Sequence, residues 1–271
     1  MGEERDYLLG TNDEELERLG LQHRVWRPRA ADAWRRAGFT FGQTLLDVGC
    51  GPGFATLDLA EIVGPGGRVI AVDRSRRFLD ALERACAWRG LTNVTVFEQD
   101  LDQGALQARD ADGACGRWVF AFVQRPRDLL ERVAAALRPG GTLVLHEYFH
   151  YETWRVAPRC AQHEEFVQHV IAGWRASGGE PDIALQLPRW LGELGFEVRE
   201  LRPLVEVVDP KSYVWQWPKS FVASALRRMV ELGTLAADRA QVIGKAMAAC
   251  EHTPHTWMVT PSVLEIVASR R

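Results

Sequence analysis

The sequence predicts an α/β fold built around a mostly parallel sheet. Between residues 44 and 146, short apolar runs alternate with segments of helical periodicity. Parallel neighbouring strands need long crossover connections, which helices supply, so this alternation is typical of consecutive βαβ units. The composition agrees, because 46% of the 271 residues are hydrophobic and 25% are charged, as in an ordinary globular protein.

The N-terminal segment is predicted to be helical. Residues 11–14, Thr-Asn-Asp-Glu, have the spacing of a capping box, and apolar residues follow at helical intervals. We expect this helix to reach about Trp26. A second helix is expected to start at Pro28 and to end at Gly38, because proline favours the first turn of a helix and glycine its end. Together they form a predicted cap over residues 1–40.

The central segment is expected to hold five buried strands. The strands are predicted at 45–48, 68–73, 94–97, 111–115 and 142–146, with helices at 54–63, 78–89 and 128–137. Beyond residue 150 the alternation ends. There we expect aromatic helical insertions at about 151–180 and 210–250, a short helix at 188–195, and strands at about 196–208 and 256–267.

Charge and cysteine content exclude several classes of protein. The net charge of −3 gives no basic signal for nucleic acid, so we expect no such partner. The five cysteines are an odd number without a CxxC pair, which favours a reducing cytoplasm and no metal site. The acidic N-terminus is unlike a signal peptide, and no apolar run approaches the roughly 20 residues of a membrane span.

A glycine-rich turn follows the first strand, in Leu45-Leu46-Asp47-Val48-Gly49-Cys50-Gly51-Pro52-Gly53-Phe54. A strand that turns directly into a helix exposes backbone N–H groups, and glycines let a ligand approach them closely. The spacing is GxGxG, and Phe54 occupies the third glycine position of a dinucleotide motif. Asp47 adds negative charge, which disfavours a pyrophosphate and suits a ligand with an amino group and a sulfonium.

Three carboxylates follow three successive strands. Asp47 is joined by Asp73, well placed for a ribose diol, and by Asp100, which could accept a hydrogen bond from an adenine amino group. Open α/β sheets bind ligands at the carboxyl ends of their strands. The alternatives without ligand binding are a helix N-cap for Asp73 and a loop carboxylate for Asp100.

These motifs resemble the core of the class I S-adenosylmethionine-dependent methyltransferases. The matching segments are LLDVGCGPGF, VIAVD, the QDL at 99–101 and LRPGGTLVLHE at 137–147. The resemblance implies a Rossmann-like, seven-stranded, mostly parallel sheet with helices on both faces and an antiparallel last strand. It further implies S-adenosylmethionine as cofactor, a cofactor-binding core at 41–150, and the rest of the sheet with lid insertions at 151–271.

The resemblance also implies which residues hold the cofactor. The N-terminal YLLGTNDEELERLGLQH is similar to the leader of small-molecule methyltransferases, in which Tyr7, Gln22 and His23 would cap the cofactor carboxylate; packing alone is the alternative for these three. The full set of predicted cofactor residues is Tyr7, Gln22, His23, Asp47, Gly49, Cys50, Gly51, Gly53, Asp73, Arg74, Asp100, Leu101, Gly116 and Arg117.

The predicted reaction is methyl transfer to an O, N or C atom of a small organic molecule. His146 is the best-placed base, unless it only forms a hydrogen bond at the edge of the sheet. The predicted acceptor pocket is lined by Tyr148, Trp154, Trp215, Trp217 and Phe221. The aromatic residues of the insertions equally suit a core or a homodimer face. A cofactor-binding relative that acts through a protein partner, and an NAD-dependent oxidoreductase, are the rival functions.

Overall fold

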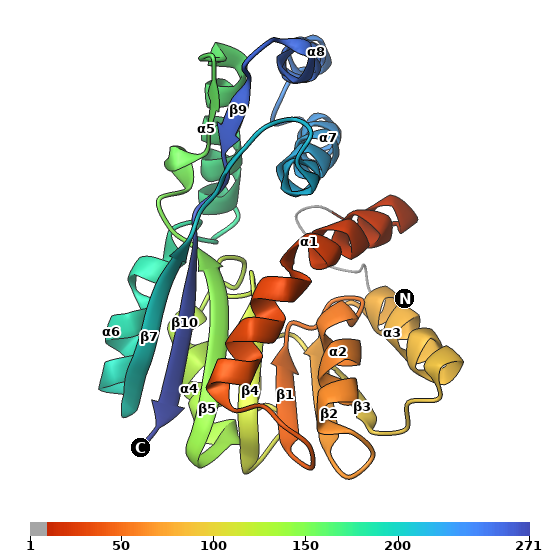
Figure 1. Cartoon of the computed structure of the whole chain (residues 1–271), viewed down its shortest axis with the longest axis vertical. Coiled ribbons are helices and arrows are strands. Elements are labelled where there is room, and N and C mark those ends of the chain that lie inside the picture. Colours follow the sequence, from red (N-terminus) through yellow and green to blue (C-terminus); the bar gives the residue numbers. More distant parts are fainter. Residues whose placement is uncertain (1–9) are drawn as a thin grey trace.

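A seven-stranded sheet forms the centre of the molecule, seen in a computed structural model that describes residues 10–271 (Figure 1). Its strands are β1 (Thr44–Val48), β2 (Arg68–Asp73), β3 (Val94–Glu98), β4 (Ala111–Arg117), β5 (Leu137–Tyr148), β7 (Phe196–Leu204) and β10 (Val263–Arg270). They lie in the order β3-β2-β1-β4-β5-β10-β7. The pairs from β3 to β5 are parallel, whereas β10 runs antiparallel to both β5 and β7. The predicted fold class is confirmed.

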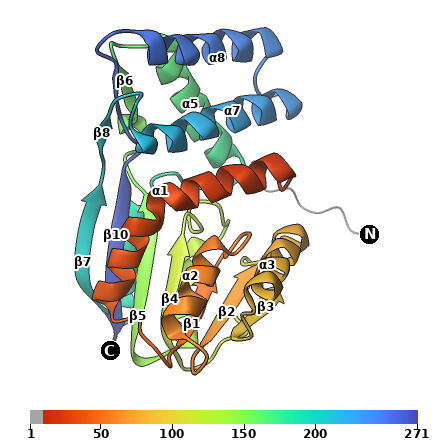
Figure 2. The same cartoon turned by 45° about the vertical axis from the view of Figure 1, so that its right-hand side comes forward.

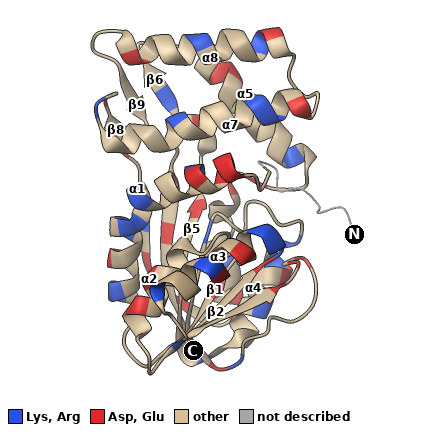
Figure 3. Ribbon diagram, turned by 90° about the vertical axis from the view of Figure 1, so that its right-hand side faces the viewer, with Lys and Arg blue, Asp and Glu red and all other residues tan. Residues whose placement is uncertain are grey.

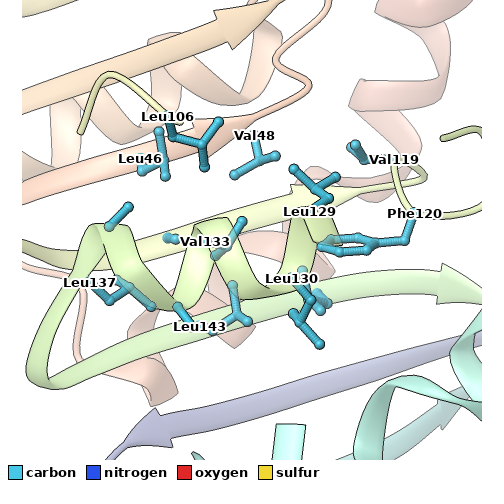
Figure 4. Close-up of a cluster of buried hydrophobic side chains, with 14 of the residues drawn as sticks. Leu46, Val48, Leu106, Val119, Phe120, Leu129, Leu130, Val133, Leu137 and Leu143 are labelled. Carbon is cyan, nitrogen blue, oxygen red and sulfur yellow. The ribbon is translucent and has the colours of Figure 1, made fainter. Parts of the chain in front are cut away.

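Helices cover both faces of this sheet. One face carries α1 (Asp13–Ala37), α2 (Phe54–Val63) and α3 (Arg76–Arg89); the other carries α4 (Pro126–Ala136) and α6 (Leu187–Glu193). Side chains alternate along a strand, so Leu45 packs with α1 and α2 while its neighbour Leu46 packs with α4. Figure 4 shows Leu46 and Val48 on the side of Leu129 and Val133 of α4. The double burial explains why the strands are continuous apolar runs.

The N-terminal segment forms one helix, α1, and the prediction of two helices was wrong. Its N-cap is Asn12, whose side chain accepts a hydrogen bond from the Glu15 N–H at 2.9 Å, and Pro28 lies inside the helix. Proline lacks the N–H that would bond the carbonyl of Arg24, and its ring crowds that carbonyl. The helix therefore bends instead of ending, and its first half crosses above the sheet (Figure 1).

A second layer lies above the carboxyl edge of the sheet (Figure 2). Its small sheet has the order β6-β9-β8, and three helices surround it. The elements are β6 (Arg155–Ala157), α5 (Ala161–Ala176), β8 (Val207–Val208), α7 (Gln216–Glu231), α8 (Ala237–His252) and β9 (Trp257–Val259), with 3₁₀ turns at Tyr151–Thr153, Ile183–Leu185 and Tyr213–Trp215. One aromatic cluster fills the space between these elements.

Two predicted strands are each divided between the two sheets. The strand expected at 196–208 separates into β7 and β8, and that expected at 256–267 separates into β9 and β10. Glu206 and Thr260 hold the crossing point: the Thr260 N–H donates to the Glu206 carbonyl at 2.9 Å, and the Glu206 N–H donates to the Thr260 hydroxyl at 3.0 Å. An apolar pattern does not reveal which sheet a residue joins, so the sequence could not show this division.

The surface and the helices carry no single dominant charge on the side shown in Figure 3, where basic and acidic residues are intermixed. No helix within residues 10–271 combines the length and apolarity that a bilayer crossing requires. The division of the chain at residues 40 and 150 stays a prediction.

Candidate active site

The turn between β1 and α2 is shaped by its glycines. Gly51 and Gly53 have φ values of 54° and 81°, a region that side chains rarely adopt. A Cβ atom at Gly51 would meet nothing within 4 Å, whereas one at Gly53 would collide with Leu82 of α3. Gly53 therefore serves packing between two helices. Gly51 leaves open space in front of the turn, as a closely approaching ligand needs.

Asp73, at the end of β2, fixes this turn. Its carboxylate accepts hydrogen bonds from the Gly51 N–H at 2.8 Å and from the Ser75 N–H at 2.9 Å, and the side chain is buried. The N-cap of α3 is Ser75, so Asp73 is not the helix cap; its carboxylate instead joins the glycine turn to the residue that begins the helix.

A cavity of roughly 390 Å³ opens at the turn, between the carboxyl ends of the strands and the first half of α1. Within the described residues, the predicted cofactor residues that line it are Gln22, Asp47, Gly49, Cys50, Gly51, Arg74, Asp100, Leu101 and Arg117. His23, Gly53, Asp73 and Gly116 do not belong to this lining, and Tyr7 lies outside the described residues.

Asp47 lies at the floor of the cavity. Its carboxylate accepts a hydrogen bond from the Thr56 hydroxyl at 2.6 Å and lies 3.7 Å from the Cys115 sulfur. Burial raises the pKa of Asp47 to about 6, although the Thr56 hydrogen bond and the charge of Arg117 oppose this rise. A cationic ligand group beside Asp47 would stabilise the ionised form.

Arg117, at the end of β4, brings a buried cation to the same floor. Its Nη2 atom lies 3.2 Å from His23 Nδ1, and His23 Nε2 lies 3.1 Å from an Asp58 oxygen, which Arg27 also contacts at 2.8 Å. The Nη1 atom of Arg117 is buried and has no hydrogen-bond partner among residues 10–271. A buried donor without a partner is costly, so this atom suits an anionic ligand group.

Asp100 and Leu101 form the far side of the cavity, in the loop after β3. The Asp100 carboxylate accepts hydrogen bonds from the Asp102 N–H at 3.0 Å and from the Gln103 amide at 3.1 Å. The loop therefore holds the carboxylate in place at the end of its strand.

Comparison with known proteins shows what the central segment is similar to. Residues 45–141 match the family model of a methyltransferase domain. Nocamycin O-methyltransferase of Saccharothrix syringae is 36% identical over 104 residues, which cover 38% of this chain and 37% of that enzyme. Residues 45–141 therefore form a methyltransferase domain of the class I S-adenosylmethionine-dependent type. These similarities support S-adenosylmethionine as the cofactor of this domain.

Other similarities extend over more of the chain. An uncharacterized 37.1 kDa protein in transposon TN4556 of Streptomyces fradiae is 31% identical over 169 residues, covering 61% of the chain and 47% of that protein. The structure of the [4+2]-cyclase SpnF shares the fold, with a TM-score of 0.56 and 19% identity over 89% of this chain and 80% of its own. The chain spans about half the length of the curated relatives it matches.

Five aromatic rings beyond the β1–α2 turn line the cavity: Trp118, Phe122, Tyr148, Trp174 and Phe221. Trp118 is stacked between Tyr148 and Trp217, with ring centroids 5.4 Å and 5.6 Å away. Phe122 and Tyr148 both contact Trp174, at 5.0 Å and 5.7 Å. These contacts hold the rings in place before any ligand arrives.

The predicted acceptor residues divide into two groups. Tyr148 and Phe221 line the cavity. Trp154, Trp215 and Trp217 are buried in the aromatic cluster of the upper layer and are not among the cavity-lining residues. Trp217 supports the wall indirectly, through its stacking on Trp118.

His146, the predicted base, lies inside the sheet. It is buried, and its Nε2 atom lies 3.1 Å from a Glu265 oxygen on the adjacent strand β10. Burial lowers the pKa of His146, so the ring is neutral and donates to Glu265. Since His146 does not line the cavity, the structure gives it the cross-strand hydrogen bond that was the alternative to a catalytic role.

A polar cluster on α1 was missed by the sequence analysis. Arg18 donates to both oxygens of Glu15, at 2.6 and 2.7 Å, and to the Gln22 side-chain oxygen at 2.9 Å; all three side chains line the cavity. The signal was present, because positions three and four apart share a helix face. Trp118 and Phe122 were also missed as cavity residues, since they meet the other rings only through tertiary packing.

Proposed function

We propose that this chain transfers a methyl group from S-adenosylmethionine to an O, N or C atom of a small organic molecule. The observation that carries the proposal is one cavity with two different parts. Its lining combines charged groups at the glycine turn, Asp47 and Arg117, with a set of preorganised aromatic rings, and the two parts meet where Arg117 lies 5.4 Å from the ring of Trp118. This arrangement suits a charged cofactor beside a largely apolar acceptor.

The charged part fits the cofactor group by group. Asp47 matches an ammonium, and the partnerless Nη1 of Arg117 matches a carboxylate, with the amide of Gln22 beside it. Gly51 leaves room for the chain of the methionine part, whereas Gly49 packs closely against Val119. Cys50 lies between them in the lining, with Gly53 and Gly116 in support. Asp73 and Arg74 are assigned to the ribose, and Asp100 and Leu101 to the adenine.

The bound cofactor supplies a methyl group already activated on a sulfonium. The protein's part is then to align the acceptor atom with that group and to exclude water. Burial raises the pKa of Tyr148, so its hydroxyl stays protonated and can orient an acceptor by donating a hydrogen bond. His146 takes no part in proton transfer in this mechanism, because its ring lies within the sheet.

The test measures binding and turnover separately. Calorimetry should detect S-adenosylmethionine binding to the full chain and no heat from NAD above dilution. Methyl transfer from labelled cofactor is then measured against a metabolite extract. Binding with turnover supports the proposal. Binding of cofactor without transfer to any acceptor supports instead the relative that acts through a protein partner, and NAD binding supports an oxidoreductase.

A further inference from the structure

Part of the cavity lining carries a surplus of hydrogen-bond donors. A guanidinium has five N–H donors and no acceptor. Arg18 uses three of them, two toward Glu15 and one toward Gln22, which leaves two without a partner in the part of the chain that the structure describes. The acceptor oxygens of its two partners are already engaged by these same bonds.

Two more donors belong to the aromatic wall itself. The Tyr148 hydroxyl makes no hydrogen bond with residues 10–271, and its side chain lines the cavity. The indole Nε1–H of Trp118, another lining residue, is buried and has no partner among the same residues. Arg18 and Arg117 both act electrostatically on Tyr148, and Arg18 and Tyr148 line the same cavity.

The rings set the shape of the ligand. Trp118, Phe122, Tyr148, Trp174 and Phe221 come from the loop after β4, from β5, from α5 and from α7. Contacts among them fix the planes of the rings, as described for Trp118 and Trp174. Flat aromatic molecules gain most from such fixed faces and edges. An alkylammonium would also be attracted by aromatic faces, but the free N–H groups of Arg18 would repel it.

From this wall we infer that the methyl acceptor is a flat aromatic or fused-ring molecule carrying an anionic or strongly accepting oxygen, such as a carboxylate, phenolate or keto group. The role of this ligand as a methyl acceptor rests on the proposed function. Its binding does not, because the wall is complementary to it with or without methyl transfer. The oxygen would lie at Arg18 and Tyr148, and the rings against Trp174 and Phe221.

Three probes of matched size separate shape from charge: 2-naphthoate, 2-naphthylmethylammonium and decahydro-2-naphthoate. Their affinities are measured by calorimetry on the full chain, with and without saturating S-adenosylhomocysteine. We expect 2-naphthoate to bind at least roughly tenfold more tightly than either of the others. Equal affinities, a preference for the ammonium, or no detectable binding of 2-naphthoate overturns the inference.

Variants locate the effect. Trp174→Leu should reduce 2-naphthoate affinity several-fold, and the paired change Glu15→Gln with Arg18→Gln should abolish the preference for the anion without leaving a buried charge unpaired. Exposed residues supply the controls: Trp88→Leu and Arg35→Gln should change neither the affinity for 2-naphthoate nor the preference for the anion. Unchanged selectivity in the paired variant overturns the assignment of the oxygen to Arg18. If the unaltered chain does not bind S-adenosylhomocysteine, that result counts against the proposed function alone.

Discussion

The Nδ1 atom of His23 accepts a hydrogen bond from Arg117 at 3.2 Å. A guanidinium can only donate, so the proton of His23 must lie on Nε2, which donates to Asp58 at 3.1 Å. The neutral ring thus connects α1 and α2 to the end of β4 and fixes the orientation of Arg117. His23 is a positioning residue in this arrangement, and not the direct cofactor contact that the sequence suggested.

This relay predicts a dependence of cofactor affinity on pH. Burial lowers the pKa of His23 below its usual 6.5. Above that lowered pKa the ring is neutral and accepts from Arg117; below it, the protonated ring cannot accept, and two cations face each other. Affinity for S-adenosylmethionine should therefore fall as the pH drops through this pKa. His23→Phe should weaken binding at neutral pH by roughly 1–3 kcal/mol, because it removes both hydrogen bonds.

His23→Gln isolates the titration from the geometry. A glutamine oxygen can accept from Arg117 while its amide donates to Asp58, so affinity should be kept and the contribution of His23 to the acid-side fall removed. The exposed His252→Gln is the control and should leave the profile unchanged. Calorimetric titrations over a pH series make the comparison. Wild-type affinity in His23→Phe, or an unaltered profile in His23→Gln, would contradict the relay.

Asp47 should show a trade between stability and binding. Its pKa is raised from 3.8 to about 6, so the folded state holds the proton more tightly than the unfolded state does. The ionised carboxylate therefore lowers stability as the pH rises through this window, and the full cost applies above it. Asp47→Asn should raise the free energy of unfolding at pH 8 by about 1–3 kcal/mol. Cofactor affinity should fall in the same variant, because an amide cannot neutralise an ammonium.

Thermal melting beside calorimetry checks both effects. Asp112→Asn is the contrasting control: the carboxylate of Asp112 accepts from Arg138 at 2.8 Å and its pKa is lowered, so neutralising it should not stabilise the fold. An Asp47→Asn variant that melts earlier at pH 8 and still binds the cofactor normally would remove Asp47 from the site.

Alanine variants of three glycines separate the effects of backbone strain, side-chain packing and ligand access. Gly51→Ala introduces a side chain at a positive φ, which costs about 1–3 kcal/mol, and projects it into open space at the cavity. We expect it to fold and to lose most of its cofactor affinity. Gly53→Ala adds a collision with Leu82 and should melt earlier than Gly51→Ala. Gly233→Ala is the matched control, with φ 69° and no atom near the new Cβ.

Melting curves and S-adenosylhomocysteine titrations on the three variants distinguish these effects. Gly233→Ala should share the backbone strain of Gly51→Ala and keep full activity in the assay of methyl transfer from labelled cofactor. Equal cofactor affinity in Gly51→Ala and Gly233→Ala would mean that no ligand passes close to the turn.

Local patterns were sufficient to predict the part of the fold between β1 and β5. Strand, glycine turn and helix are all specified within about ten residues of Asp47, so their positions followed from burial and turn chemistry. The continuous α1 could not be predicted this way. Its residues Trp26 and Trp34 are buried on either side of Pro28 in the chain, and their packing offsets the cost of the proline. The local sequence shows the proline and its cost, but it does not show this packing.

The upper layer depended on tertiary information. Tyr213, Trp215 and Trp217 occupy alternate positions in the sequence, as residues on one face of a strand do. In the structure Tyr213–Trp215 is a 3₁₀ turn and α7 begins at Gln216, so a period of two does not apply there. Tyr213 is exposed, while Trp215 and Trp217 are buried in the cluster. The cavity wall also takes Trp118, from the loop after β4, and Trp174, from α5, which have no shared sequence pattern.

Trp217 and Phe221, one turn apart on α7, should respond differently to truncation. Trp217 is 3% exposed and its ring contacts Trp26 at 4.9 Å and Trp118 at 5.6 Å. Trp217→Ala should therefore cost about 3–5 kcal/mol of stability and reduce cofactor and acceptor binding together. Phe221 lines the cavity and is only half-buried, so Phe221→Ala should melt close to wild type, keep S-adenosylhomocysteine affinity and lose acceptor binding or turnover.

The two variants are compared by thermal melting, S-adenosylhomocysteine titration and 2-naphthoate titration on the same preparations. A Trp217→Ala protein that melts normally and loses only the acceptor would restore Trp217 as part of a lid over the acceptor. A Phe221→Ala protein that loses cofactor and acceptor affinity in parallel would show that α7 supports the whole cavity. The acceptor side would then not be separable from the cofactor side, because both would depend on the same packing between α7 and α1.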